Sequence, residues 1–141
     1  MSVELFKNIE FEKVLKLKEL VAYSEGRVSS KTLAQKEEVS VTLLSFDKGE
    51  GLSTHSAPGD AMIIILEGSV RVAIGENPKV VLNEGDTTVM PANIPHALEA
   101  LEKFKMMLIV VKPNEQELQE LEELQEAKGK TEKNNCGCEC S

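Results

Sequence analysis

The sequence is poor in aromatic and basic side chains. Its 141 residues include no tryptophan, one tyrosine and four phenylalanines. Base stacking and sugar stacking both use exposed aromatic rings, so this scarcity disfavours both kinds of ligand. The 16 Lys and Arg are outnumbered by 24 Asp and Glu, which leaves a net charge of −8. Because contacts to phosphate need clustered Lys or Arg, we expect no nucleic-acid partner.

Long apolar runs and targeting segments are missing as well. The two longest apolar runs, Ala61 to Leu66 and Met106 to Val111, are much too short to cross a bilayer, so we expect no membrane partner. The N-terminus has no basic leader followed by an apolar block and a small-residue cleavage site, and a cytoplasmic location is therefore the expectation. The sequence also has no P-loop and no G-x-G-x-x-G stretch that opens a helix.

What the sequence does contain is a regular succession of short β-type segments, several of them rich in Val, Ile and Thr. Glycine or proline separates them every few residues, and many short strands at this spacing predict a β-sandwich or barrel. Glu67-Gly68-Ser69 predicts a tight hairpin turn, and Gly75 to Pro78 predicts the next turn. The expected strands are 40–46, 61–66, 69–74, 79–82, 87–90 and 104–111.

The two ends of the chain differ from the middle in the spacing of their apolar residues. Residues 11–22 carry apolar side chains at both helical and alternating spacing, and we interpret them as extended or mixed structure. After Pro113, an Asn and a Glu three residues apart form a capping-box pattern, and leucine then recurs at every third position. This pattern predicts a short acidic helix over 114–128, packed on the barrel or on a second subunit. We expect Gly129 to end it and residues 129–141 to form a flexible tail.

The chemistry of the chain centres on its two histidines, His55 and His96, each of which follows a turn in the β-rich part. The first pattern is Gly49, five residues, His55, one residue, Ala57, three residues, Ala61, six residues and Gly68. The second is Gly85, five residues, Pro91, one residue, Asn93, two residues, His96, three residues and Ala100. Over residues 39–111, this spacing resembles the two sequence motifs of a small single-domain cupin.

The resemblance implies an all-β fold, an antiparallel jelly-roll β-barrel with a cavity inside. This barrel would occupy residues 1–113, followed by the acidic helix and the tail. Small cupins resemble one another in forming homodimers that cover sheet edges, and we therefore expect a homodimer.

The resemblance also shows what the motifs lack. Where this chain has Ala57 and Ala61, metal-binding cupins have a second His and a Glu. In those cupins, that His and Glu form a three-His, one-Glu metal site together with the counterparts of His55 and His96. A divalent transition metal such as Zn, Fe, Mn or Ni prefers three or four protein donors. We therefore favour two pocket histidines that bond to the backbone or to a ligand, and keep a metal on His55 and His96 as the alternative.

The alanines suggest a different use of the cavity. By strand alternation, Ala61 and Ile63 share one face of a strand, as do His96 and Leu98. A lumen lined by these residues suits a small, partly apolar ligand with an anionic or hydrogen-bonding group. The expected pocket residues are His55, Ala57, Ala61, Ile63, His96 and Leu98. Asp60 is a weaker candidate, because it would point to the other face of its strand.

Two functions from different classes remain open. The first is non-catalytic binding or sensing of a small molecule, with metal weak or absent. The second is a metal-dependent enzyme of the oxygenase or isomerase type that uses His55 and His96 as ligands. No catalytic residue is assigned in either case.

Three cysteines, Cys136, Cys138 and Cys140, close the chain. Three thiolates can bind a soft metal such as zinc or Cu(I), but paired C-x-x-C knuckles are absent and we expect free thiols. A third possibility is that the acidic helix and this tail recruit a partner while the barrel serves as a scaffold.

Overall fold

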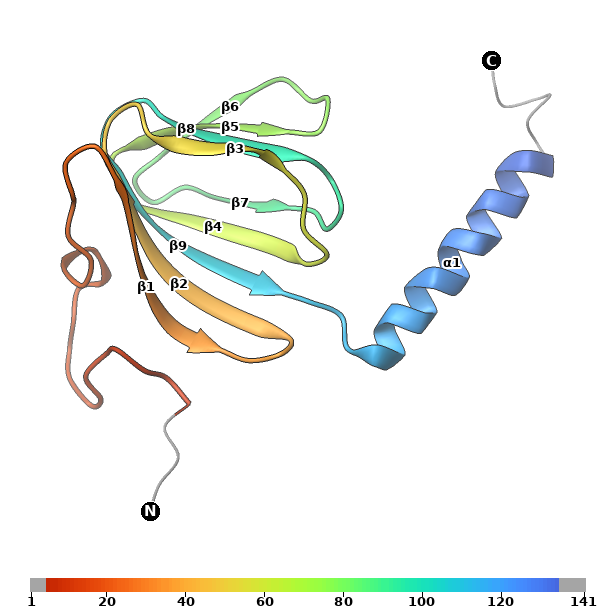
Figure 1. Ribbon diagram of the computed structural model, residues 1–141, viewed down its shortest axis with the longest axis horizontal. Helices are drawn as coiled ribbons and strands as arrows, with labels where there is room; N and C mark the ends of the chain where they lie inside the picture. Colours follow the sequence, from red (N-terminus) through yellow and green to blue (C-terminus); the bar gives the residue numbers. More distant parts are fainter. Residues whose placement is uncertain (1–4, 135–141) are drawn as a thin grey trace.

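The strands form two facing antiparallel sheets, as the sequence predicts. The computed structural model describes residues 5–134, and Figure 1 shows the two sheets with helix α1 extending from one end of them. The five-stranded sheet has the order β1 (Val28–Gln35), β2 (Val39–Phe46), β9 (Phe104–Val111), β4 (Asp60–Glu67) and β7 (Thr87–Met90). The four-stranded sheet has the order β3 (Gly51–His55), β8 (His96–Ala100), β5 (Ser69–Ile74) and β6 (Val80–Asn83). The all-β jelly-roll prediction is confirmed.

The sequence located six of the nine strands that the described residues form. The six expected segments agree with β2, β4, β5, β6, β7 and β9 to within one residue at each end. The expected segments did not include β1, β3 or β8. Strands β1 and β3 lie at the edges of their sheets and are rich in Ser, Thr and other polar residues, whereas β8 is an inner strand that contains no Val, Ile or Thr. Strands β6 and β7 also lie at sheet edges and were found, so the omissions follow from the residues of each strand and not from its place in the sheet.

The main core lies between the two sheets. The rings of Phe46 and Phe104 stack in it with their centroids 4.5 Å apart. Alternate residues of facing strands fill the remaining space, which is why the interior is packed with side chains. The buried members are Phe46, Ala61, Ile63, Ile65, Val70, Val72, Leu82, Met90, Leu98, Ala100, Phe104 and Met106.

The N-terminal segment covers part of the outer face of the five-stranded sheet. It contains a short 3-10 helix, η1 (Leu17–Glu19), in otherwise irregular chain, within the segment interpreted above as extended or mixed structure. Val21 packs there against Leu33 and Leu43, and the Ser45 hydroxyl donates a hydrogen bond of 2.7 Å to the carbonyl of Ala22. These contacts form a second, smaller core.

The turn at Gly68 corrects one prediction. The chain does turn there, with φ at +81°, but β4 and β5 belong to different sheets, so the turn is a crossover and not a hairpin. A strand–glycine–strand sequence gives no information on whether the two strands pair. A Cβ at Gly68 would collide with the carbonyl oxygen of Lys103, so the crossover needs glycine. The turn at 75–78 does join two paired strands, β5 and β6.

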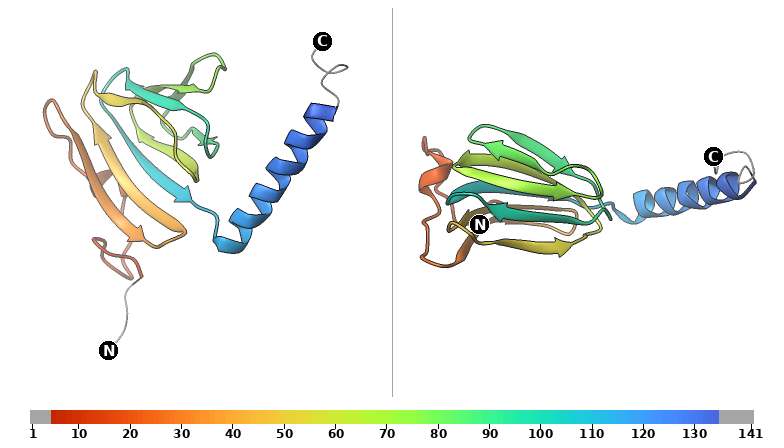
Figure 2. Two further views of the ribbon diagram at one scale, coloured as in Figure 1. Left: turned by 45° about the vertical axis from the view of Figure 1, so that its right-hand side comes forward. Right: turned by 90° about the horizontal axis from the view of Figure 1, so that it is seen from above.

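Helix α1 (Glu115–Asn134) leaves the barrel after β9 and projects away from it (Figures 1 and 2). The predicted capping box is present: the Asn114 side-chain oxygen accepts from the backbone N–H of Glu117 at 2.7 Å, and the Glu117 carboxylate accepts from the N–H of Asn114 at 3.1 Å.

The end of α1 differs from the prediction. The helix continues through Gly129 to Asn134, because a single interior glycine costs only about 1 kcal/mol relative to alanine. Of the two predicted packings, on the barrel or on a second subunit, the first is not seen, since Leu118, Leu121 and Leu124 are exposed; packing on a second subunit stays a prediction. No helix in the described part of the chain is both long and apolar enough to cross a membrane.

Candidate functional site

A bulge in β3 brings the two histidines together. Leu52 of β3 pairs with Leu98 of β8. An undisturbed antiparallel register would then place Thr54 opposite His96 and turn His55 to the other face. A shift in register after Leu52 inserts one residue, so that His55 lies directly opposite His96. The bulge was not visible in the sequence, although the motif spacing did single out both histidines.

The two imidazoles form a contacting pair at one end of the barrel. Their ring centroids lie 4.4 Å apart, with the ring planes inclined at 70°. His96 is 5% exposed, whereas His55 is exposed to solvent. The pair therefore has one face in the barrel and one face open to solvent.

Backbone carbonyls orient both rings. Nδ1 of His55 lies 2.9 Å from the carbonyl oxygen of Ser53, and Nδ1 of His96 lies 3.2 Å from that of Ile94. A carbonyl oxygen only accepts, so each Nδ1 carries the proton and donates it. In the neutral rings both Nε2 atoms then keep a free lone pair, and each gains an N–H only when its ring is protonated.

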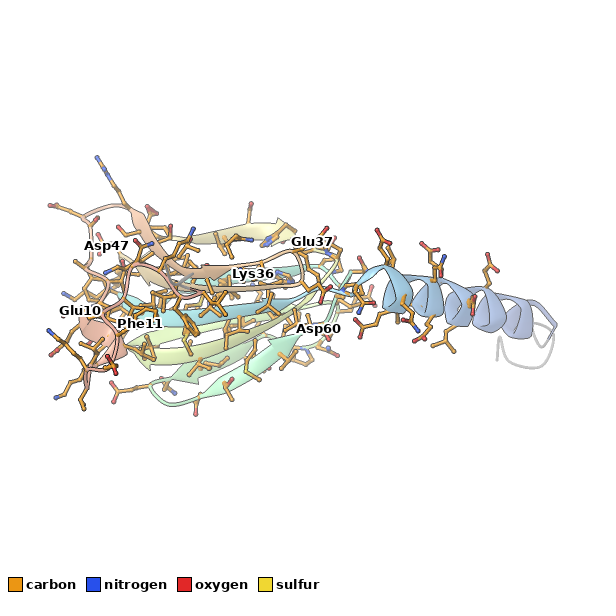
Figure 3. All side chains as sticks on the ribbon, turned by 90° about the horizontal axis from the view of Figure 1, so that it is seen from below. Glu10, Phe11, Lys36, Glu37, Asp47 and Asp60 are labelled. Carbon is orange, nitrogen blue, oxygen red and sulfur yellow. The ribbon has the colours of Figure 1, made fainter. Side chains whose placement is uncertain are left out.

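Two hydrogen bonds join the loops that carry the histidines. The N–H of Asn93 donates to the carbonyl of Ala57 at 2.7 Å, and the N–H of Ala92 donates to the carboxylate of Asp60 at 2.8 Å. Asp60 lies at the α1 end of the barrel with Lys36 and Glu37, while Asp47 lies at the opposite end (Figure 3). Asp60 therefore links the two loops through a hydrogen bond, a role that the sequence pattern did not indicate.

The apolar residues of the expected pocket pack in the core. Ala61, Ile63 and Leu98 are 5%, 0% and 4% exposed and contact the other core residues. Ala57 is half-buried in the loop beside His55. Contact of these four residues with a ligand stays a prediction, and the polar atoms of the site belong to the histidines at the barrel mouth.

The donor set does not complete a metal shell. No group of three or more His, Cys, Asp or Glu side chains suited to a metal ion occurs within residues 5–134. Two imidazoles, with alanines at 57 and 61, supply fewer donors than the three or four that a transition metal prefers and add no negative charge. Cys136, Cys138 and Cys140 lie outside the described residues.

The pKa of His96 is lowered below its ordinary value, first by burial, which disfavours the charged imidazolium. The nearby charge of His55 lowers it further, while the hydrogen bond to the carbonyl of Ile94 opposes the shift. His96 is therefore neutral at neutral pH and presents a lone pair at Nε2.

A groove lies beside the histidine loops. It has a volume of about 550 Å³ and is lined by α1 on one side and by the loops around Pro58 and Ala92 on the other. Neither histidine lines it. A second hollow, near Glu37 and Asn114, lies by the start of the same helix.

Comparisons with known proteins agree with the motif spacing. Residues 42–112 match the cupin domain family. A conserved protein of unknown function from Streptococcus pyogenes is 43% identical, with a TM-score of 0.77 over 81% of this chain and 99% of that chain. No curated protein matches the chain.

Two further solved structures are similar. A cupin superfamily protein from Desulfitobacterium hafniense is 32% identical, with a TM-score of 0.73 over 77% of this chain and 98% of that one. A cupin 2 conserved barrel domain protein from Leptotrichia buccalis is 43% identical, with a TM-score of 0.66 over 70% of this chain and 47% of that one.

Proposed function

The chain belongs to the cupin family, and we propose that it binds a small carboxylate-bearing molecule at the barrel mouth without catalysing its conversion. The observation that carries this proposal is the pairing of His55 and His96, whose rings lie 4.4 Å apart. The two come from distant parts of the chain, and a bulge, two carbonyl contacts and the linked loops hold them together.

The chemistry of the pair supports a ligand that carries a carboxyl group. With both Nδ1 protons held by carbonyls, a protonated ring donates from Nε2 to a carboxylate, and a neutral ring accepts from a carboxylic acid or hydroxyl. Apolar residues of the main core, among them Leu98 on the same face of β8 as His96, would contact an apolar part of the ligand. Protonation of His96, whose pKa is lowered by burial, should therefore strengthen carboxylate binding as the pH falls.

The incomplete donor set favours binding over metal-dependent catalysis. Ala57 and Ala61 occupy the positions where metal-binding cupins are expected to have His and Glu, and neither side chain can donate electrons to a metal. The metal-dependent alternative needs donors beyond the two imidazoles.

A thermal unfolding screen tests the proposal. The full-length protein, purified without an affinity tag, is heated with a panel of small mono- and dicarboxylates at millimolar concentration. A ligand at 100 times its dissociation constant stabilises the native state by about 2.7 kcal/mol. We expect at least one acid to raise the Tm, and His55→Ala or His96→Ala to abolish the rise.

Two results would contradict the proposal. One is that no acid raises the Tm, or that the rise persists in both variants. The other is near-stoichiometric metal in the tag-free protein that is lost in both variants, which would favour the metal-dependent enzyme.

A further inference from the structure

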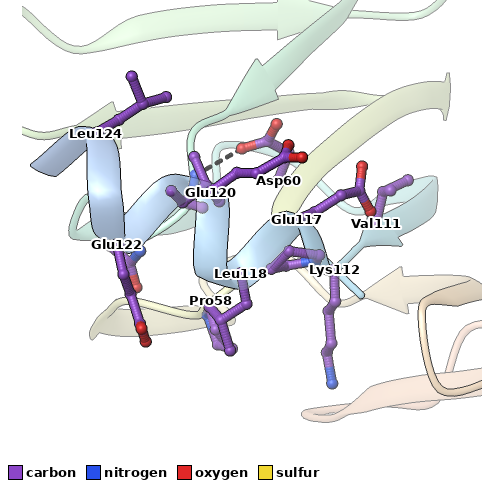
Figure 4. Close-up of a pocket in the computed structure, with 13 residues that line it drawn as sticks. Pro58, Asp60, Val111, Lys112, Glu117, Leu118, Glu120, Glu122 and Leu124 are labelled. Carbon is purple, nitrogen blue, oxygen red and sulfur yellow. Dashed lines mark hydrogen bonds between the residues drawn. The ribbon is translucent and has the colours of Figure 1, made fainter. Parts of the chain in front are cut away.

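The groove beside the barrel has an apolar wall formed by one helix. Leu118, Leu121 and Leu124 of α1 line it, together with Pro58 and Ala92 of the loops; Figure 4 labels Leu118, Leu124 and Pro58 among the lining residues. The three leucines are 46%, 46% and 58% exposed. No residue of the described part of the chain covers this row.

The geometry at the start of α1 keeps the row open. The capping box of Asn114 and Glu117 fixes where the helix begins, and only Lys112, Pro113 and Asn114 connect it to β9. The helix then runs away from the sheets (Figure 2). In this arrangement the leucines face a space outside the barrel that another molecule can enter.

The rim of the groove is acidic. Asp60, Glu117, Glu120 and Glu122 line it, and Lys112 is the basic residue among the lining residues. The apolar wall of leucines, flanked by carboxylates, is complementary to a helix with an apolar row flanked by Lys or Arg.

The charge pattern argues against a second copy of the chain as the occupant. Pairing two α1 helices through their leucines would bring Glu120 and Glu122 of each copy close to the same carboxylates of the other. Like charges placed opposite one another across an interface oppose association, and each chain carries a net charge of −8.

We propose that this groove binds a basic amphipathic helix of another protein. Apolar side chains at positions i, i+3 or i+4 and i+7 of that helix pack on the leucines, and its Lys or Arg residues lie against the acidic rim. Neither histidine lines this groove, although the loops that do line it lie close to His55 and His96 in the sequence.

A synthetic Lys/Leu amphipathic helical peptide serves as the probe, with a scrambled peptide of the same composition as its control. Binding to the full-length protein is measured by fluorescence anisotropy at low and high salt. The groove variant Glu120→Gln/Glu122→Gln is compared with Glu123→Gln/Glu126→Gln, which makes the same charge change on the same helix at residues that do not line the groove.

We expect the groove variant to bind the peptide about fivefold more weakly, and the control variant to differ from the wild type by less than about twofold. Leu121→Gln should weaken binding about tenfold. It should leave the barrel unfolding curve unchanged, since the leucine is exposed. Binding should also weaken as salt rises.

Three results would overturn the proposal. The first is no binding of the amphipathic peptide, or equal binding of the scrambled one. The second is equal losses in the two double variants, which would mean attraction to net charge alone. The third is self-association of the free chain in sedimentation equilibrium that Leu121→Gln abolishes, since the occupant would then be a second copy.

Discussion

The barrel and helix α1 are held by different forces. In the barrel, large apolar side chains such as Ile63 and Phe104 are wholly buried between two sheets. In α1, the leucines are exposed, and the helix start is fixed by hydrogen bonds between neighbouring residues. The comparison teaches that the site-bearing part of the molecule does not depend on the helix for its stability. Changes in α1 should therefore alter interactions while the barrel stays folded.

The largest contrast should come from matched truncations in the two regions. Ile63→Ala removes a fully buried side chain from the core and should lower the free energy of unfolding by about 3–4 kcal/mol. Leu121→Ala, on the exposed helix face, should change it by less than about 0.5 kcal/mol. Urea unfolding measures both, and equal losses would show that α1 is packed as tightly as the core.

The crossover between the sheets provides a second way to break the barrel alone. Gly68→Ala adds a Cβ that collides with the carbonyl of Lys103 at a positive φ, and should destabilise the protein by about 2–3 kcal/mol. Gly26→Ala is a matched control, because it has a positive φ but open space around its Cβ. Equal losses in the two variants would show that the collision has no effect.

The cap of α1 should affect the helix and not the barrel. Asn114→Ala removes the side-chain acceptor for the N–H of Glu117 and should destabilise the helix by about 1 kcal/mol. Far-UV circular dichroism should show a loss of helix, while the barrel unfolding midpoint stays within error. Asn114→Asp keeps an acceptor and should retain the helix. A lower barrel midpoint in the alanine variant would contradict the independence of the two regions.

The smallest expected effect is a pH dependence from His96. Its folded pKa is lowered below the ordinary 6.5, so the unfolded chain binds more protons in the interval between the two values. The contribution of His96 to the free energy of unfolding is therefore fully present above pH 6.5. It decreases as the pH falls towards the folded pKa. Urea unfolding of His96→Gln should show a shallower decline over this interval, and an unchanged slope would contradict the shift.

The fold was largely predictable because alternation records burial. Short runs rich in Val, Ile and Leu located β2, β4 and β5, whereas the polar residues of β1 and β3 and the HALEA sequence of β8 left no such pattern. Whether the turn at Gly68 joins paired strands depends on contacts far away in the chain, and alternation does not record those. The length of α1 was underestimated because glycine was treated as a helix end.

The site was predictable in part. The spacing of the motifs identified His55 and His96, and their pairing follows from the strand order. Two tertiary features were not revealed by the spacing of residues along the sequence. They are the bulge that turns His55 towards His96 and the hydrogen bond from the N–H of Ala92 to Asp60. The acidic groove also required the direction of α1, which the capping pattern alone does not give.

The most direct test of the paired histidines as one binding point is an NMR titration of both imidazoles. The nitrogen-15-labelled protein is titrated with the carboxylate that raises the Tm most in the thermal screen, and the ring resonances of His55 and His96 are followed together. We expect both rings to shift with the same apparent dissociation constant, with both Nδ1 protons retained. A shift confined to one ring, or different constants for the two, would contradict a shared site.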